Sequence, residues 1–329
     1  MDFGFDDTQR ALAGVARQIF ETHATHDRLK ELEAGGQSFD RELWATLEGA
    51  GLLSIGVEDG GFLEQCIVLV EQGRSVAPVP LWSHLVGNTF ARTSGRRIVT
   101  VALDEPGAES AFARTLSASH NTLTGTKTGV PAWDEATTVV VSASDGLYVV
   151  DADDVVAERH PVTPRFPEFT LTFDATPATR IESDPADLAR RAIVAVCALG
   201  VGVAERALEL TAAYTSERKQ FGAPLGSFQA VQQRAADAYI DVEAMRVTMW
   251  EAAWRISEGL DADHAVSVAK FWAAEGGQRV VSAAQHLHGG LGADIDYPLH
   301  RYTLSSKWIE LSFGGATPTL ARLGAELVG

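Results

Sequence analysis

The chain has 329 residues, of which 46% are hydrophobic and 22% charged, so it is long enough for two or three domains with buried cores and is not disordered. Its formal net charge of −17 at pH 7 argues against general binding to nucleic acid or anionic membranes, although a local basic pocket can still hold a phosphate. The start lacks signal-peptide features and no apolar run could span a bilayer, which predicts a cytoplasmic protein without membrane contact. Cys66 and Cys197 form no CxxC pair, so we expect buried, reduced thiols and no metal site.

Residues 7 to about 92 have helical periodicity. Asp6 and Gln9 form a helix start signal, and the apolar residues that follow fall on one helical face: Leu12, Val15, Ala16, Ile19 and Phe20. Further helical segments follow around 39–52 and 62–76. We therefore expect an N-terminal helical domain over residues 1–94.

The middle of the chain changes to short runs rich in β-branched residues. These runs read IVTVAL, TTVVVSA, LYVVDA and FTLTF, and turn sequences such as EPG and SDG separate them. We interpret 161–187, which is rich in proline and aspartate, as the last hairpin and exit of this region. The pattern predicts a small β domain over residues 95–182.

The last part of the chain is helical again. Long helical segments are predicted near 189–217, 228–258, 264–288 and 298–312, and four helices of this length most simply form a bundle over residues 183–329. The predicted fold class is therefore mainly α with a central β domain.

A basic and aromatic cluster, SERKQFGAPLGSFQ at 216–229, separates the first two bundle helices. Arg218 offers a fork of donors suited to a phosphate, Gln220 can donate and accept, and Phe221 offers a face for stacking. Such a cluster is also consistent with a solvated charge pair at a helix end. The residues alone therefore leave two interpretations open, a binding site for a phosphate-containing ligand and a solvated helix end.

This order of domains, together with RKQFGAPLGSFQ and HLHGGLGADIDYPLHR at 286–301, resembles the acyl-CoA dehydrogenase family. The two motifs are specific in combination, and LDEPGAES at 103–110 and LTGTKTGVPAW at 123–133 add to them. The resemblance implies an N-terminal helical domain, a middle β-barrel-like domain and a C-terminal four-helix bundle. It also implies FAD as cofactor and the α,β-desaturation of acyl-CoA thioesters.

The resemblance also implies which residues bind the cofactor. In the family, the arginine motif and the Gly-Gly stretch bind the pyrophosphate and adenosine half of an FAD held mainly by the neighbouring subunit. Carried over to this sequence, the cofactor-binding residues are Arg218, Gln220, Phe221, Phe228, Gln229, His286, Gly289 and Gly290. His286 departs from the glutamine that the family often has.

The flavin-ring half of the family's site is altered in this chain. The Trp-x-Thr that commonly contacts the ring is replaced by Gly129, Val130 and Pro131, and Asp104 stands where a small polar residue is usual. Trp133 is close but out of register, so we expect it to pack within the domain.

The catalytic carboxylate is also missing from its family positions. Desaturation requires a base near the α carbon. Counting from the Gly-Gly motif places Phe313 at the usual glutamate position, and counting back from RKQFG places Ala192 at the alternative one. Glu310, Asp294 and Asp296 are weak substitutes, so no catalytic residue is predicted.

Intact phosphate-side residues combined with a missing base predict a non-catalytic subunit that lends FAD contacts to a catalytic acyl-CoA dehydrogenase partner. The short chain resembles subunits of the heterotetrameric enzymes of steroid-degrading actinobacteria, which act on CoA thioesters of cholesterol side chains. Two alternatives remain open: a self-sufficient homo-oligomeric flavoprotein with a relocated base, and a flavin-free interaction protein of the same fold.

Two smaller patterns are interpreted as structural. His286 and His288 are two residues apart, which on a helix places them on different faces and argues against a metal pair. Gly200 and Gly202 lie within a helical pattern with no strand before them, so they do not indicate a dinucleotide-binding turn.

Overall fold

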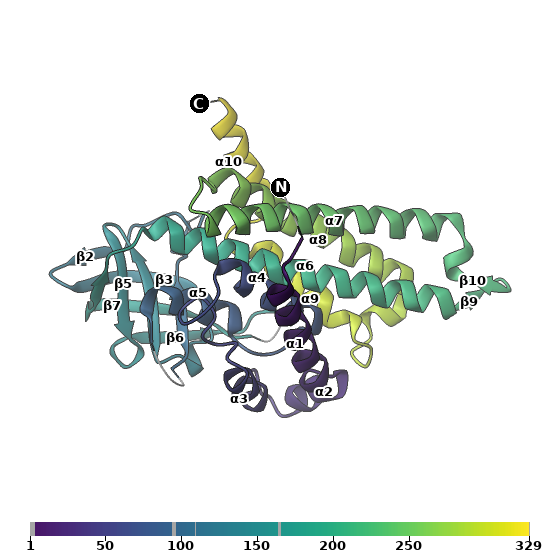
Figure 1. Cartoon of the computed structure of the whole chain (residues 1–329), viewed down its shortest axis with the longest axis horizontal. Coiled ribbons are helices and arrows are strands. Elements are labelled where there is room, and N and C mark those ends of the chain that lie inside the picture. The colour runs from purple at the N-terminus through teal and green to yellow at the C-terminus, as the bar shows by residue number, and fades with distance from the viewer. Residues whose placement is uncertain (1–3, 94–96, 109, 164–165, 329) are drawn as a thin grey trace.

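The computed structural model describes residues 4–93, 97–108, 110–163 and 166–328. Figure 1 shows three groups of elements along the longest axis: a β domain at one end, the N-terminal helices beside the middle, and long C-terminal helices that extend to the opposite end. The mainly α class with a central β domain is confirmed.

The N-terminal part contains five helices, and the first begins as predicted. The Asp6 carboxylate accepts the Gln9 N–H (2.8 Å), and the Gln9 side chain accepts the Asp6 N–H (3.2 Å), which completes a capping box. The helices are α1 (Asp7–His23), α2 (His26–Ala34), α3 (Arg41–Gly49), α4 (Phe62–Ser75) and α5 (Leu81–Ala91).

Helix α4 is buried along most of its length because it crosses the first bundle helix, α6 (Pro185–Glu217), at very short range. A Cβ atom at Gly73 would lie 2.2 Å from the Leu199 carbonyl oxygen, and one at Gly202 would lie 2.0 Å from the Val70 carbonyl oxygen. Gly202 therefore serves backbone packing, in agreement with the structural interpretation of the Gly-x-Gly pair.

The middle part forms two four-stranded sheets. One has the order β1-β4-β5-β8 and the other β2-β3-β7-β6, and β1 pairs with β4 in parallel while the other pairs are antiparallel. Trp133 packs against the apolar core between them, as expected. The strands are β1 (Val99–Ala102), β2 (Ser117–Ser119), β3 (Thr122–Pro131), β4 (Thr138–Ala143), β5 (Gly146–Asp151), β6 (Val156–His160), β7 (Glu168–Pro177) and β8 (Thr179–Ile181).

A buried ion pair lies inside this part. Lys127 is fully buried, and its Nζ donates to Glu105 Oε1 (2.7 Å), the Leu103 carbonyl (2.9 Å) and Ser142 Oγ (3.1 Å). Burial opposes ionisation of Glu105, but hydrogen bonds from Lys127, Thr115 and Leu116 outweigh it and hold the Glu105 pKa at about 2.

The C-terminal part contains α6, α7 (Gln229–Ser257), α8 (Asp263–His288) and α9 (Leu299–Leu311). One face of α7 is apolar and is buried at Ala238, Val242, Met245 and Met249. A further helix, α10 (Ala316–Val328), was not predicted; it contacts α8, and its Arg322 donates to Ser110 and Ser267. Helices α6 and α7 extend past the others to a tip formed by β9 (Lys219–Gln220) and β10 (Ala223–Pro224) (Figure 1).

Within the described residues, no helix is both long and apolar enough to cross a membrane. Both Cys66 and Cys197 are buried and free, as predicted, and burial raises the pKa of the Cys66 thiol and that of Cys197, the latter to about 12.

Candidate cofactor site

The tip between α6 and α7 carries the basic residue expected to bind a cofactor phosphate. Arg218 caps α6: its N–H donates to the Tyr214 carbonyl (2.8 Å), and its own carbonyl accepts the Leu225 N–H (2.8 Å). The side chain is exposed, and its guanidinium has no ion-pair partner among the residues that the structure describes. In a strongly acidic protein, this guanidinium is available for an anionic ligand.

Phe221, at the turn of the hairpin, is both exposed and conformationally strained. Its side chain is 94% exposed and its φ is 53°, in the left-handed region that disfavours residues with a Cβ atom. The edge of its ring contacts Phe228, with ring centroids 6.3 Å apart and an interplanar angle of 89°. An exposed phenyl ring in a strained turn is consistent with contact to a bound group or a second chain.

The N-terminus of α7 adds a second positive feature to the tip. Its N-cap residue, Phe228, provides no side-chain hydrogen bond, and Gln229 is the exposed first residue of the helix. A helix N-terminus carries partial positive charge, and its backbone N–H groups bind phosphate oxygens. Because the Arg218–Leu225 hydrogen bond holds Arg218 close to this end, the two features together suit a pyrophosphate.

The Gly-Gly stretch follows α8 and is open to solvent. His286 is exposed on the last turn of α8, while Gly289, with φ of 61°, and Gly290 are exposed in the turn that follows. A Cβ atom at either glycine would meet no atom within 4 Å, so a ligand can approach this backbone closely. His288, which lies between His286 and Gly289, is buried. This agrees with the prediction that His286 and His288 are on different faces of the helix.

A ring contact links the end of α6, which leads to the tip, with the end of α8, which leads to the Gly-Gly stretch. The Tyr214 ring stacks on the His288 ring, with centroids 4.4 Å apart and an interplanar angle of 16°. The predicted cofactor residues therefore form two groups: Arg218, Gln220, Phe221, Phe228 and Gln229 lie at the tip and the start of α7, and His286, Gly289 and Gly290 lie at the end of α8.

A second site, which we call the β-domain cavity, has a volume of ≈ 390 Å³ and lies between the β domain and the end of α9. Asp104, Gly129 and Phe313, which replace family residues at different points of the sequence, all line it. A Cβ atom at Gly129 would lie 3.7 Å from Glu168 Oε2 and 3.8 Å from Asp104 Oδ2. Two carboxylates therefore border the space next to residue 129.

The carboxylates next to Gly129 in the β-domain cavity do not suit a flavin ring, and Lys307, which also lines the cavity, is ion-paired with Glu310. Burial raises the pKa of Asp104 to about 6, Lys127 opposes this shift, and the neighbouring Glu168 adds to it. Glu168 accepts a hydrogen bond from Trp308 Nε1 (2.6 Å). A flavin ring presents carbonyl oxygens and gains negative charge on reduction, so it requires donors or positive charge beside it and not carboxylates.

Phe313, the residue that counting along the sequence aligns with the expected base, belongs to an aromatic cluster at the end of α9. Lys270 is almost fully buried, and its Nζ donates to the carbonyls of Ile309 (2.7 Å) and Glu310 (3.1 Å), which fixes the last turn of α9. The chain then turns at Phe313, with φ of 59°, and the Phe313 ring packs edge-on against Trp82 at a centroid distance of 5.9 Å.

The substitute carboxylates considered from the sequence lie elsewhere. Glu310 binds Lys307 (2.5 Å), Asp296 binds Lys30 (2.5 Å), and Asp294 accepts the Asp296 N–H (2.9 Å). None of the three carboxylates is among the residues that line the β-domain cavity. Ala192 is fully buried within α6. No group of three or more histidine, cysteine, aspartate or glutamate residues in the described part of the chain could hold a metal ion.

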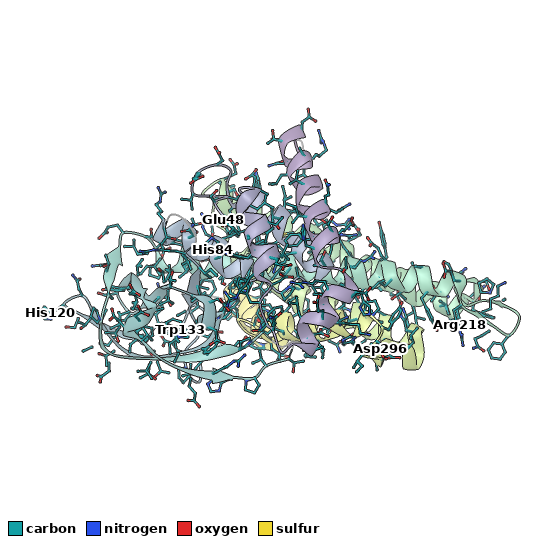
Figure 2. All side chains as sticks on the ribbon, turned by 90° about the horizontal axis from the view of Figure 1, so that it is seen from below. Glu48, His84, His120, Trp133, Arg218 and Asp296 are labelled. Carbon is teal, nitrogen blue, oxygen red and sulfur yellow. The ribbon has the colours of Figure 1, made fainter. Side chains whose placement is uncertain are left out.

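The tip and the β domain lie at opposite ends of the molecule. Figure 1 shows β9 and β10 at one end of the long axis and the sheets of the β domain at the other, and Figure 2, turned by 90°, separates the labelled Arg218 from Trp133 in the same way. The tip of this chain therefore lies far from its own β domain.

Sequence reasoning missed the residues that act across long sequence separations. Glu168 and Trp82 in the β-domain cavity, and Tyr214 and Tyr297 around His288, were not singled out. Each of these residues lies in a regular helix, strand or turn segment and belongs to no recognisable motif, so nothing in the neighbouring sequence indicates its role.

The comparisons with known proteins agree with this fold. Residues 189–326 match the family described as acyl-CoA dehydrogenase, C-terminal domain. Over 99% of this chain and 99% of the relative, the sequence is 36% identical to acyl-CoA dehydrogenase FadE27 of Mycobacterium tuberculosis (strain ATCC 25618 / H37Rv), and with the same coverage it is 31% identical to FadE28 of that strain.

Solved structures give the same result. The chain superposes on the ChsE4-ChsE5 complex from Mycobacterium tuberculosis with a TM-score of 0.91 and 36% identity, over 100% of this chain and 99% of that one. A structure named as the Tcur3481-Tcur3483 steroid ACAD gives a TM-score of 0.91 and 42% identity over 98% of both chains.

Proposed function

We propose that this chain, which belongs to the acyl-CoA dehydrogenase family, is a non-catalytic subunit of a heteromeric acyl-CoA dehydrogenase. In this role it completes the FAD site of a catalytic partner. FAD is the cofactor of the family and supplies the acceptor for the hydride. One observation carries the proposal: the residues suited to FAD phosphates lie at the end of the molecule opposite its own β domain (Figure 1).

The tip has a defined task in this assembly. Arg218 and the uncapped N-terminus of α7 bind the pyrophosphate of an FAD held by the partner, and the open backbone at Gly289 and Gly290 lets the cofactor approach. Phe221 stacks on or packs beside the adenosine half, which buries the ring that is exposed in the isolated chain.

The β-domain cavity supports the non-catalytic half of the proposal. The position of the family base is taken by Phe313, which packs against Trp82, and Asp104 and Glu168 border the space next to Gly129. A chain with this lining lends contacts to the FAD of another subunit and holds no flavin ring of its own.

The substrate of the complex is proposed from its relatives. A structural relative at 42% identity is named as a steroid ACAD, and a second relative is a complex of two different proteins. We infer that the complete enzyme desaturates a bulky acyl-CoA whose acyl group is a steroid side chain.

The test is to purify the chain alone and together with a catalytic acyl-CoA dehydrogenase subunit from the same organism. We expect flavin absorbance in the complex and none in the chain alone. In the complex, Arg218→Ala should weaken FAD binding about 10- to 100-fold, because a charged hydrogen bond to phosphate is removed. Arg255→Ala, at the other end of α7, is the matched control and should change nothing.

Two outcomes contradict the proposal. A chain that is yellow when purified alone holds its own flavin. Unchanged flavin content in the Arg218→Ala complex would mean that the tip does not bind the cofactor, as expected for a flavin-free interaction protein of the same fold.

A second candidate function is supported by Asp104. Its carboxyl is largely buried in the β-domain cavity, and a pKa raised to about 6 is suited to accepting a proton near neutral pH. A self-sufficient enzyme with Asp104 as base predicts that the isolated chain binds flavin, that the flavin bleaches with an acyl-CoA, and that Asp104→Asn abolishes the bleaching.

A further inference from the structure

His288 connects the two segments that we assign to FAD, although it is itself buried. It is 3% exposed and lies directly before Gly289 at the end of α8. Its ring stacks on Tyr214 at 4.4 Å. The Tyr214 carbonyl in turn accepts the N–H of Arg218 (2.8 Å), so a short series of contacts runs from Gly289 through His288 and Tyr214 to Arg218.

Both ring nitrogens of His288 are engaged. The Ala284 carbonyl can only accept, so Nδ1–H donates to it (2.8 Å), and the unprotonated Nε2 accepts from the Tyr297 hydroxyl (3.1 Å). Burial lowers the pKa of His288, which keeps the ring in this neutral form. The two hydrogen bonds fix the orientation of the ring, and its flat face supports Tyr214.

The His288 ring thereby joins three elements: the end of α6 through Tyr214, the end of α8 through Ala284, and the segment before α9 through Tyr297. The exposed residues that face a ligand have little support of their own. Phe221 contacts Phe228, and the two glycines have open space around them. Groups that bind one ligand from two helix ends must be held close to their productive positions by the residues around them.

We propose that His288, together with Tyr214 and Tyr297, is a positioning unit that fixes the Arg218 tip relative to the Gly-Gly stretch and so sets the FAD affinity of the complex. The inference rests on the proposed function, since it assumes that both segments bind one FAD. His288 acts through its neighbours and does not touch the cofactor.

The experiment measures the FAD dissociation constant of the complex after the flavin has been removed and added back. We expect His288→Ala to raise this constant about tenfold and Tyr214→Leu to raise it by a similar factor. Tyr214→Phe keeps the stacked ring and should stay within twofold of the unaltered complex. Tyr297→Phe removes one hydroxyl and should have an intermediate effect, whereas Tyr148→Phe, whose hydroxyl bonds Asp145 in the β domain, should have none.

A double-mutant cycle separates positioning from general loss of structure. If His288 acts by placing Arg218, the effect of His288→Ala should largely disappear in a chain that already carries Arg218→Ala. Full additivity of the two changes, or equal affinities of the Tyr214→Leu and Tyr214→Phe complexes, would overturn the inference. Arg218→Ala without effect on FAD affinity would overturn the proposed function itself.

Discussion

Two phenylalanines with left-handed backbone conformations belong to two different regions of this molecule, the tip and the β-domain cavity. Phe221 at the tip has φ of 53° and is 94% exposed, whereas Phe313 beside the β-domain cavity has φ of 59° and packs against Trp82. The basic residues of the two regions show the same contrast between exposure and burial. Arg218 is exposed without an ion-pair partner among the described residues, and Lys127 is buried against Glu105.

The comparison separates groups that stabilise the fold from exposed groups that we propose bind a ligand. Around the β-domain cavity, Phe313 packs on Trp82 and Glu168 accepts a hydrogen bond from Trp308, whereas the Asp104 carboxyl is left with a raised pKa. At the tip the same residue types are exposed and uncompensated, which gives the isolated chain no stability. Substitutions at the two ends should therefore affect different measurements.

The largest effect on stability is expected at the buried ion pair. Glu105→Gln leaves the Lys127 ammonium buried without its counter-charge, so the free energy of unfolding should fall by about 3 to 5 kcal/mol. Urea unfolding of the isolated chain measures it. Glu158→Gln, an exposed glutamate of the same domain, is the matched control and should change the value by less than about 0.5 kcal/mol. A loss below about 1 kcal/mol for Glu105→Gln would show that this pair does not stabilise the β domain.

A smaller effect of opposite sign is expected at Asp104. Its pKa in the folded chain is raised to about 6 by burial, so the ionised carboxylate destabilises the fold at neutral pH. Asp104→Asn should raise the free energy of unfolding by about 1 to 3 kcal/mol at pH 7. The difference should shrink as the pH falls through 6 towards 4, because the unaltered carboxyl then becomes neutral in the fold.

Urea unfolding at pH 7 and pH 5 tests this dependence on pH. Asp154→Asn, on the surface of the β domain, is the control and should show no such trend. A difference between parent and Asp104→Asn that stays constant from pH 7 to pH 5 would mean that Asp104 has no raised pKa.

The architecture was predictable from the sequence because its signals are local. The capping residues Asp6 and Gln9, the apolar face of α7 and the β-branched runs each specify their element within a few turns or strands of chain. Helix α10 was missed because the last predicted helix ended near residue 312 and no element was assigned to the rest of the predicted bundle domain, which runs to residue 329.

The candidate site was predictable only in part. The tip motif is contiguous, so its residues could be named from sequence and the structure places them together. The β-domain cavity joins Asp104 and Gly129 to Trp308 and Phe313, and the positioning unit joins Tyr214 to His288. Such contacts depend on how α6, α8 and α9 pack, which no periodicity within one segment determines.

The smallest effect on stability, and the sharpest test of the comparison, is expected at Phe221. Its ring contacts Phe228 but is otherwise exposed, so Phe221→Ala should change the free energy of unfolding of the isolated chain by less than about 0.5 kcal/mol. Phe313→Ala is the matched control: it has the same side chain and the same left-handed backbone, but its ring packs on Trp82, so a loss of about 1 to 3 kcal/mol is expected. In the complex the order should reverse, with Phe221→Ala weakening FAD binding about tenfold through lost stacking and Phe313→Ala leaving it unchanged. If both substitutions lower the free energy of unfolding of the isolated chain equally, the Phe221 ring is packed in solution. The aromatic rings of the tip and of the β-domain cavity would then contribute to stability in the same way.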